Sequence, residues 1–288
     1  MTTHFTRRNF LTTTTAAAAA GLMSVPNIFG DETQRRFSIG ICDWDLRLSG
    51  NPKAFALAKE LGYDGVEVSY QPEGEWSLSQ SKNRPLFLEE AAKQNVKISS
   101  LAMGLLNARP LSFTPEAAEW VADCIETLAE MKIKTVLLAF FGNDKIKGNA
   151  EARNAVIEKL KVLAPKAEKN GVVLGFESWL NAKEHLAVLE AVGSPALKVY
   201  YDEQNMLTMN YPIYEDLETL LKEKAVCRIH VKENSFRLGD GLVDFKRIRD
   251  ILVKYGYKDW VVAESGVKGD WKESLAANAE FLKQTFTL

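Results

Sequence analysis

The chain has 288 residues, of which 46% are hydrophobic and 26% charged, and its net charge is −2. These are ordinary values for a globular protein long enough to build a large core. After residue 30 the sequence has no block of basic residues and no apolar run of the ~18–20 residues that a membrane span needs. The composition therefore argues against a membrane span in that part of the chain and against nucleic acid as a partner.

Residues 1–30 differ in composition from the rest of the chain. They contain no acidic residue, and the pair Arg7-Arg8 is followed by Asn-Phe-Leu and by a stretch rich in threonine and alanine. This order is typical of an export signal and resembles a twin-arginine (Tat) signal; an ordinary secretory signal is the alternative. We therefore expect a signal peptide over 1–30, a mature domain over 31–288, the twin-arginine export machinery as a partner, and a periplasmic or extracellular location.

From residue 37 onward, short apolar runs alternate with longer amphipathic stretches. The runs are rich in Val, Ile, Leu and Tyr, and most are continuously apolar, as expected of strands covered on both faces. They predict eight strands, at 37–42, 65–70, 97–103, 135–140, 172–177, 197–202, 227–231 and 260–265.

Helical patterns lie between these runs. One extends from Pro52 to Gly62, two residue types that favour the start and the end of a helix. Another begins at Thr114, a good N-cap residue, and has acidic residues in its first turn, which suits the helix dipole. Further helical patterns cover 149–171, 244–257 and 271–286.

Strict alternation of strands and helices predicts a parallel sheet with right-handed crossovers. Eight such units in a chain of this length predict a single-domain (β/α)8 TIM barrel of the α/β class. A doubly wound sheet is the alternative, which is disfavoured because no Gly-x-Gly-x-x-Gly turn follows the first strand. The cysteines, Cys42, Cys124 and Cys227, lie far apart, and we expect buried thiols rather than a disulfide framework.

Strands five to eight each carry a metal-binding type of residue at or near the carboxyl end, where active sites of such barrels lie. These residues are Glu177, Asp202, His230 and Glu264. Each alone has an ordinary structural interpretation: a helix cap or ion-pair partner for an acid, and a core residue for the histidine. Together, three carboxylates at one mouth would repel one another without a cation. Three oxygen donors and one imidazole suit Mn²⁺, Mg²⁺, Co²⁺ or Zn²⁺, so the pattern predicts one divalent metal ion without identifying it.

The segments around these residues resemble the xylose isomerase-like TIM barrel family, often described as sugar phosphate isomerases and epimerases. The matching segments are GFESW, YYDEQN, IHVKEN and VVAES, which contain Glu177, Asp202, His230 and Glu264 in turn. The resemblance implies that these four residues bind the metal ion. It also implies that Glu177 and Glu264 are catalytic, one removing the proton next to a carbonyl and the other returning it to the enediolate.

Side chains on the loops after the strands are candidates for binding substrate. They are Asn205, Lys232, Glu233 and Arg237 for sugar hydroxyls, and Trp44 and Trp179 for stacking on a sugar face. The alternatives are solvated loop charges or structural hydrogen bonds for the first group, and core packing for the tryptophans. The chain has Asn205 where many members have histidine, and Lys183 where related ketose epimerases often have a substrate-binding glutamate. The second departure argues against the specificity of a ketohexose epimerase.

These observations predict a divalent-metal-dependent sugar isomerase or epimerase. An exported enzyme meets few sugar phosphates, so we expect a small, unphosphorylated carbohydrate as substrate. The resemblance implies a first alternative, a 3-keto-glycoside lyase that acts by β-elimination with the same metal ion and glutamates. A secreted carbohydrate-binding barrel without catalysis is the second. The sequence leaves the oligomeric state open, a homo-oligomer included.

Overall fold

The computed structural model describes residues 37–287, with the exception of 235, 236, 266 and 268. The predicted signal peptide over 1–30 lies outside the described residues.

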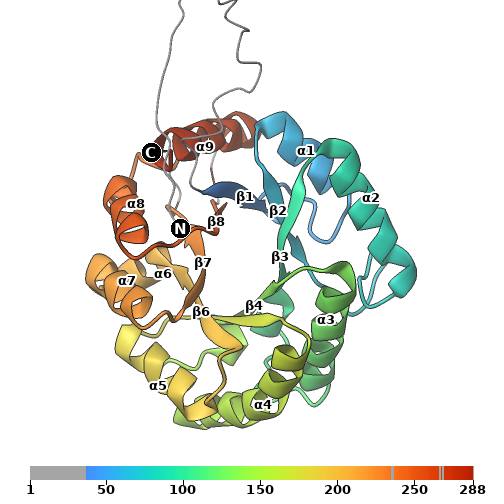
Figure 1. The fold of residues 1–288 in the computed structure, drawn as a ribbon, viewed down its shortest axis with the longest axis vertical. Helices are drawn as coiled ribbons and strands as arrows, with labels where there is room; N and C mark the ends of the chain where they lie inside the picture. Colours follow the sequence, from blue (N-terminus) through green and yellow to red (C-terminus); the bar gives the residue numbers. More distant parts are fainter. Residues whose placement is uncertain (1–36, 235–236, 266, 268, 288) are drawn as a thin grey trace, which may run out of the picture. The chain divides into compact units, whose positions relative to one another are not determined.

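Eight parallel strands close into a barrel in chain order, with β8 paired to β1 (Figure 1). This confirms the predicted (β/α)8 TIM barrel, and the predicted strand bounds agree with the observed ones to within two residues. The strands are β1 Ser38–Cys42, β2 Gly65–Ser69, β3 Lys97–Met103, β4 Thr135–Phe140, β5 Val173–Ser178, β6 Leu197–Asp202, β7 Val226–Val231 and β8 Trp260–Ala263.

Helices surround the barrel (Figure 1). The α-helices are α1 Ala54–Leu61, α2 Arg84–Gln94, α3 Ala117–Met131, α4 Ala150–Lys169, α5 Ala182–Val192, α6 Glu203–Thr208, α7 Ile213–Lys222, α8 Phe245–Lys254 and α9 Trp271–Thr285. Short 3-10 helices occur at η1 Ser81–Asn83, η2 Gly104–Asn107 and η3 Gly142–Asp144.

The helix predicted to begin at Thr114 begins three residues later, at Ala117. Thr114 belongs to the preceding turn, where its N–H donates to the carbonyl of Pro110 at 2.8 Å. Helix α1 likewise begins at Ala54 instead of Pro52, and it ends, as expected, at a left-handed Gly62 with φ of 91°. The first residue of each of these helices is therefore determined by a local turn, and the pattern of apolar residues does not predict such turns.

The core has two parts. A large layer of buried side chains lies between the strands and the helices, and a smaller cluster of Ala102, Leu137, Ala139 and Tyr200 packs with Trp44 and Phe141. The three cysteines are free thiols, as predicted; Cys42 and Cys124 are buried and Cys227 is partly buried.

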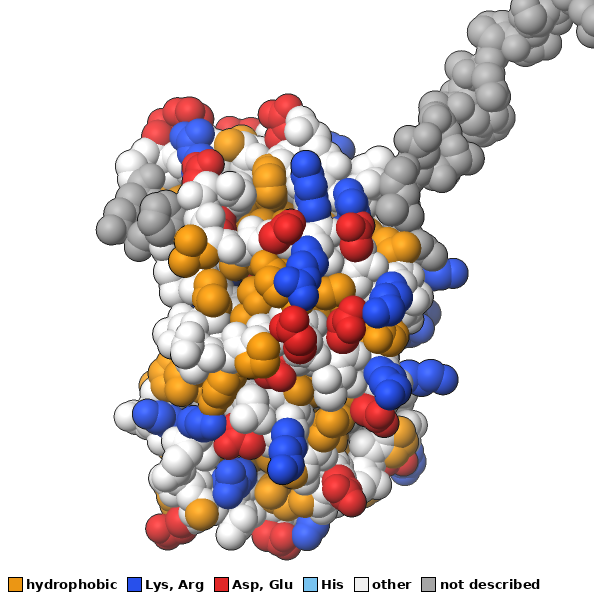
Figure 2. Space-filling view, turned by 90° about the vertical axis from the view of Figure 1, so that its left-hand side faces the viewer, with side chains coloured by type: hydrophobic (Ala, Val, Ile, Leu, Met, Phe, Trp, Pro, Cys, Tyr) orange, Lys and Arg blue, Asp and Glu red, His pale blue; other side chains and the backbone are white. Residues whose placement is uncertain are grey.

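The surface carries charges of both signs. On the face drawn in Figure 2, Lys and Arg side chains are interspersed with Asp and Glu side chains among scattered hydrophobic ones. This mixture is not the single-sign stripe that typifies a nucleic-acid-binding face. Over the described residues, no helix is both long enough and apolar enough to cross a membrane.

Candidate active site

Four adjacent strands bring Glu177, Asp202, His230 and Glu264 together at the carboxyl end of the barrel. Asp202 and His230 are paired in the register of β6 and β7, and the N–H of Glu264 donates to the carbonyl of Val231 at 3.0 Å. One ligand atom from each of the four side chains lies within 4.8 Å of those of the other three. The cluster predicted from the strand ends is therefore formed, and we call these four residues the carboxylate–histidine cluster.

The ring of His230 is fully buried and has a carboxylate on each side. Its Nδ1 lies 3.2 Å from Oε1 of Glu177 and 3.4 Å from Oε2 of Glu264. Its Nε2 lies 3.0 Å from Oε1 of Glu67, a residue of β2. Burial disfavours a charged ring, but Glu67 and Glu177 outweigh burial, so the pKa of His230 is well above its usual value. These distances show that Nδ1 faces the carboxylates of the cluster and that Nε2 faces Glu67.

The carboxyl groups of the cluster are short of positive partners. Burial raises the pKa of Glu177 to about 7, although His230 opposes the shift, and burial also raises the pKa of Asp202. Burial disfavours the charge of Glu264 too, but Lys232 and His230 outweigh it and hold the pKa of Glu264 below its usual value. A cation among these groups would relieve the repulsion between them.

One oxygen of Asp202 tests whether the donor set fits a cation. Oδ1 accepts the N–H of Asn205 at 2.8 Å, whereas the buried Oδ2 has no hydrogen-bond partner among the described residues. The ammonium of Lys232 lies 3.7 Å from this oxygen. An unsatisfied buried carboxylate oxygen is costly. The donor set of three carboxylates and an imidazole therefore fits a divalent metal ion such as Mn²⁺, Mg²⁺, Co²⁺ or Zn²⁺.

A pocket of about 460 Å³ opens at the cluster, a volume typical of small-ligand sites. Phe141 and Trp179 both line it, and the centroids of their rings lie 5.2 Å apart. Its lining consists of Trp44, Ser49, Ser69, Gln71, Gly104, Leu105, Asn107, Leu137, Ala139, Phe141, Glu177, Trp179, Asn205, Lys232 and Glu264. Aromatic rings beside hydroxyl and amide groups suit a ligand that has both apolar faces and hydroxyls.

Four of the six predicted substrate contacts line this pocket: Trp44, Trp179, Asn205 and Lys232. The amide nitrogen of Asn205 lies 3.4 Å from Oε1 of Glu177, and the ammonium of Lys232 lies 2.9 Å from Oε2 of Glu264. Their contact with a substrate stays a prediction, but the structure brings all four to the pocket that Glu177 and Glu264 also line.

The other two, Glu233 and Arg237, are not among the residues that line the pocket, and their contact with a substrate stays a prediction. Glu233 is buried beneath its own loop, where its carboxylate accepts three backbone N–H groups, those of Gly239, Gly241 and Val243. The guanidinium of Arg237 instead contacts two residues of α9, Glu273 and Ser274. Strand β7 ends at Val231, so Glu233 and Arg237 lie in the loop after it, beyond the alternation of its side chains.

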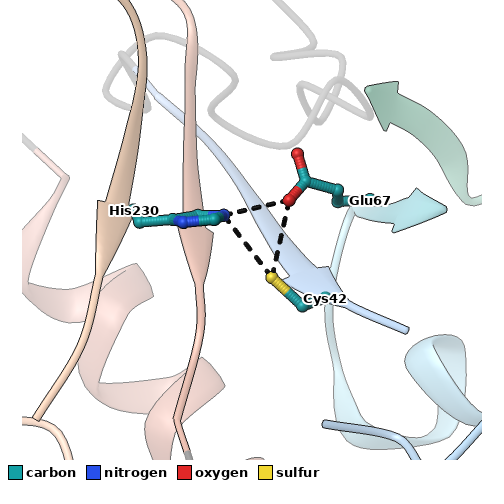
Figure 3. Close-up of side chains that lie close together, drawn as sticks. All are labelled: Cys42, Glu67 and His230. Atoms are coloured by element: carbon teal, nitrogen blue, oxygen red, sulfur yellow. Dashed lines mark hydrogen bonds and ion pairs between the residues drawn. The ribbon is translucent and has the colours of Figure 1, made fainter. Parts of the chain in front are cut away.

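Sequence reasoning missed Glu67, which contacts His230 from the side opposite the cluster (Figure 3). The signal was a single carboxylate inside the apolar strand GVEVS, all of whose residues are buried. A buried carboxylate requires partners, but the sequence alone does not show that β2 faces β7 across the barrel.

Comparison with known proteins agrees with this architecture. A family model described as xylose isomerase-like TIM barrel matches residues 55–285. The chain is 26% identical over 261 residues to the 2-epi-5-epi-valiolone 7-phosphate 2-epimerase of an Actinoplanes species, and the match covers 84% of this chain and 95% of that protein.

Two solved structures share the fold. A D-psicose 3-epimerase, crystallised in the presence of D-fructose, superposes with a TM-score of 0.74 at 16% identity, covering 87% of this chain and 99% of the other. The 3-keto-D-glucoside 4-epimerase of E. coli gives a TM-score of 0.67 at 17% identity, covering 85% and 99%. At such identities the superpositions establish the fold alone. Because the family model spans most of the sequence, the chain belongs to the xylose isomerase-like TIM barrel family.

Proposed function

We propose that the protein is a divalent-metal-dependent sugar isomerase or epimerase that acts on an unphosphorylated carbohydrate. The observation that carries the proposal is that Glu177 and Glu264 both line one pocket while each also contacts Nδ1 of His230. Two carboxylates at a shared cation site, both open to the same ligand, suit the removal and return of a proton next to a carbonyl. The Actinoplanes relative and the two solved structures described above are each named as epimerases, which supports the same reaction class.

Glu177, Asp202, Glu264 and Nδ1 of His230 would hold the metal ion, which supplies Lewis-acid polarisation of the substrate's carbonyl and hydroxyl oxygens when bound. Glu177 turns Oε1 toward His230, and Glu264 turns Oε2 toward it. We assign the proton transfers to the remaining oxygen of each glutamate.

In the proposed reaction, one glutamate removes the proton from the carbon next to the carbonyl, and an enediolate forms. The other glutamate then returns a proton, to the opposite face of the same carbon in an epimerisation. In an isomerisation the proton goes to the neighbouring carbon, and the hydroxyl proton passes from the oxygen that becomes the new carbonyl to the former carbonyl oxygen. The amide of Asn205 and the ammonium of Lys232 lie beside the two glutamates and are placed to orient the sugar hydroxyls.

The charge of the pocket supports an unphosphorylated substrate. Within the described part of the chain, Lys232 is the one cationic residue in the lining, and its ammonium is already engaged by Glu264 and Asp202. Lys145, whose ammonium lies over the ring of Trp179, does not line the pocket. The Actinoplanes relative, by contrast, is named for a phosphorylated substrate. The twin-arginine-like start of the chain supports an export route to a compartment poor in sugar phosphates.

Deuterium exchange tests the proposal directly. The metal-loaded protein is incubated in D₂O with a panel of free aldoses and ketoses, and deuterium at the carbon next to the carbonyl is measured by NMR. We expect incorporation with at least one sugar, and a loss of roughly 10²–10⁴-fold in Glu177→Gln. Glu184→Gln, in the helix after the same strand, is the matched control and should exchange like the wild type.

The same assay separates the alternatives when it includes a 3-keto-glycoside. A lyase would take the C2 proton, form a C1–C2 double bond and break the bond from C1 to the aglycone oxygen, which leaves with a proton from the second glutamate. Released aglycone with an unsaturated keto sugar would replace our proposal by β-elimination. Sugar binding without exchange or elimination in any member of the panel would identify a binding protein and overturn it.

A further inference from the structure

A second carboxylate site lies on the far side of His230 from the pocket. Glu67 of β2 is fully buried, and its Oε1 lies 3.0 Å from Nε2 of His230 (Figure 3). The thiol of Cys42 in β1 lies 3.7 Å from the same oxygen and 3.6 Å from Nε2. The ring of His230 therefore lies between Glu67 on one side and Glu177 and Glu264 on the other.

The other oxygen of Glu67 is held by two hydroxyls. Ser100 of β3 donates to Oε2 at 2.5 Å and Tyr200 of β6 donates at 2.6 Å, and both residues are buried. The ring of Tyr200 reaches this place because Gly175 of β5 has no side chain; a Cβ there would lie 2.8 Å from the ring. Several strands of the barrel thus cooperate to fix one carboxylate.

Hydrogen bonding explains these contacts better than a second metal site. Cys42, Glu67 and His230 lie close enough together to ligate an ion. However, both oxygens of Glu67 already face donors, the thiol and the ring on Oε1 and the two hydroxyls on Oε2. A carboxylate so satisfied needs no cation.

An ionised carboxylate can only accept hydrogen bonds. Glu67 accepts the hydroxyls of Ser100 and Tyr200 and the thiol of Cys42, so it also accepts a hydrogen bond from Nε2 of His230. With a proton fixed on Nε2, a metal ion at the cluster would take the place of a proton on Nδ1, because histidine binds a metal ion as a neutral ring through a nitrogen lone pair. The lone pair of Nδ1 points toward Glu177 and Glu264, the side on which the cluster would hold a metal ion. A negative partner on the far nitrogen also makes the ring a stronger ligand.

We propose that Glu67 is a positioning residue, which fixes the tautomer and the orientation of His230 so that Nδ1 serves as the metal ligand. The inference rests on the proposed metal-dependent function and goes beyond it, because it assigns a role to a residue that touches neither the pocket nor the metal position.

The test compares Glu67→Gln with the wild type in two measurements that do not depend on activity. Glutamine keeps the shape of the side chain but presents either an oxygen or an NH₂ group to Nε2, so it no longer enforces one tautomer. We expect the Kd for Mn²⁺, measured by titration calorimetry, to rise roughly 10–100-fold. In the Zn²⁺-loaded protein, ¹⁵N spectra of labelled histidine should show a protonated Nε2 of His230 in the wild type and a weakened or altered signal in the variant. The chain has only three histidines, which keeps the spectra simple.

Asp43→Asn is the matched control. Asp43 is another fully buried carboxylate at the same end of the barrel, and it accepts hydrogen bonds from Ser69 and Gly50 without contacting His230. We expect this variant to be less stable but to bind Mn²⁺ like the wild type. Equal losses of affinity in both variants would reveal general loosening of the barrel and overturn the inference, as would wild-type affinity and an unchanged spectrum in Glu67→Gln.

A second variant covers the case in which Glu67→Gln fails to fold. Ser100→Ala combined with Tyr200→Phe leaves the carboxylate in place but removes both hydroxyl donors to its Oε2. The buried charge is then poorly satisfied, and we expect weaker Mn²⁺ binding in the same direction; an unchanged Kd overturns the inference. A wild-type chain that binds no divalent ion would instead overturn the proposed function itself, so the two failures are distinguishable.

Discussion

Replacing Glu233 by glutamine tests whether this residue anchors a loop, as the structure indicates, or contacts substrate, as the sequence suggested. The side chain is 1% exposed. Its Oε2 accepts the N–H groups of Gly239 at 2.8 Å and Gly241 at 3.1 Å, and its Oε1 accepts that of Val243 at 3.1 Å. Glutamine is nearly the same size but can present an acceptor to only one side.

The cost follows from these three contacts. If the amide oxygen of glutamine replaces Oε2, the N–H groups of Gly239 and Gly241 keep a neutral acceptor, while the NH₂ group meets the N–H of Val243 as a second donor. One hydrogen bond to a charged group is lost, worth ~1.5–3 kcal/mol, and two others weaken from charged to neutral. We therefore expect Glu233→Gln to lower the free energy of unfolding by about 3 kcal/mol.

Urea unfolding followed by circular dichroism measures this change, with Glu223→Gln on an exposed turn as the control, which should stay within about 0.5 kcal/mol of the wild type. Gly241→Ala gives an independent check, because a Cβ at that position would collide with Oε1 of Glu233 and disturb the same anchor without changing the charge. If Glu233→Gln is as stable as the control while its KM for sugar rises, Glu233 contacts substrate and does not anchor the loop.

Two further predictions concern the histidines. His230→Ala should lose the bound metal ion, as measured by elemental analysis after dialysis, while its circular dichroism stays that of the folded barrel; metal retained at full stoichiometry would return His230 to a core role. His185 is buried against Phe176, and burial lowers its pKa from 6.5 to about 4. Because the unfolded chain then binds a proton that the folded chain does not, this residue should lower stability as the pH falls from ~6.5 to ~4, by up to roughly 3 kcal/mol. Urea unfolding at pH 7 and pH 4.5 should show a smaller loss in His185→Phe than in the wild type, and equal losses would refute the assignment.

The strands were predictable because each is covered on both faces, which leaves a continuous apolar run in the sequence. The run over Thr135–Phe140 is buried at every position and was predicted with its observed bounds. Helix starts were less predictable because they depend on turns, as at Thr114. Helix α5 shows the same limit: its capping box of Asn181 and Glu184 is visible in the sequence, but the helix was not assigned from it.

The cluster itself was predictable for a topological reason. A parallel barrel brings the carboxyl ends of all its strands to one mouth, so a residue at the end of β5 and one at the end of β8 can be placed together from sequence alone. Glu67 does not benefit from this rule. Its partner His230 is 163 residues away in the chain, and their contact depends on the closure of the barrel. Glu233 is a different case, since its position in a loop is fixed by backbone donors that no residue pattern reveals.

The balance of buried charge links the two layers around His230. Above the ring are the carboxyl groups of the cluster, below it is Glu67, and the positive groups that the structure places in direct contact with them are the ring itself and Lys232. Ionised carboxylates in excess of their counterions are costly in a protein interior, and the pKa of Glu177, raised to about 7 by burial, expresses that cost.

Protonating Glu177 would lower the negative charge, but it would also remove the base that the proposed reaction needs. The proposed divalent cation would restore the balance with the carboxylates still ionised. The cation would also take the place of the proton on Nδ1, while the proton on Nε2 would keep Glu67 as its acceptor. The lower carboxylate therefore supports the upper site through the orientation of a single ring.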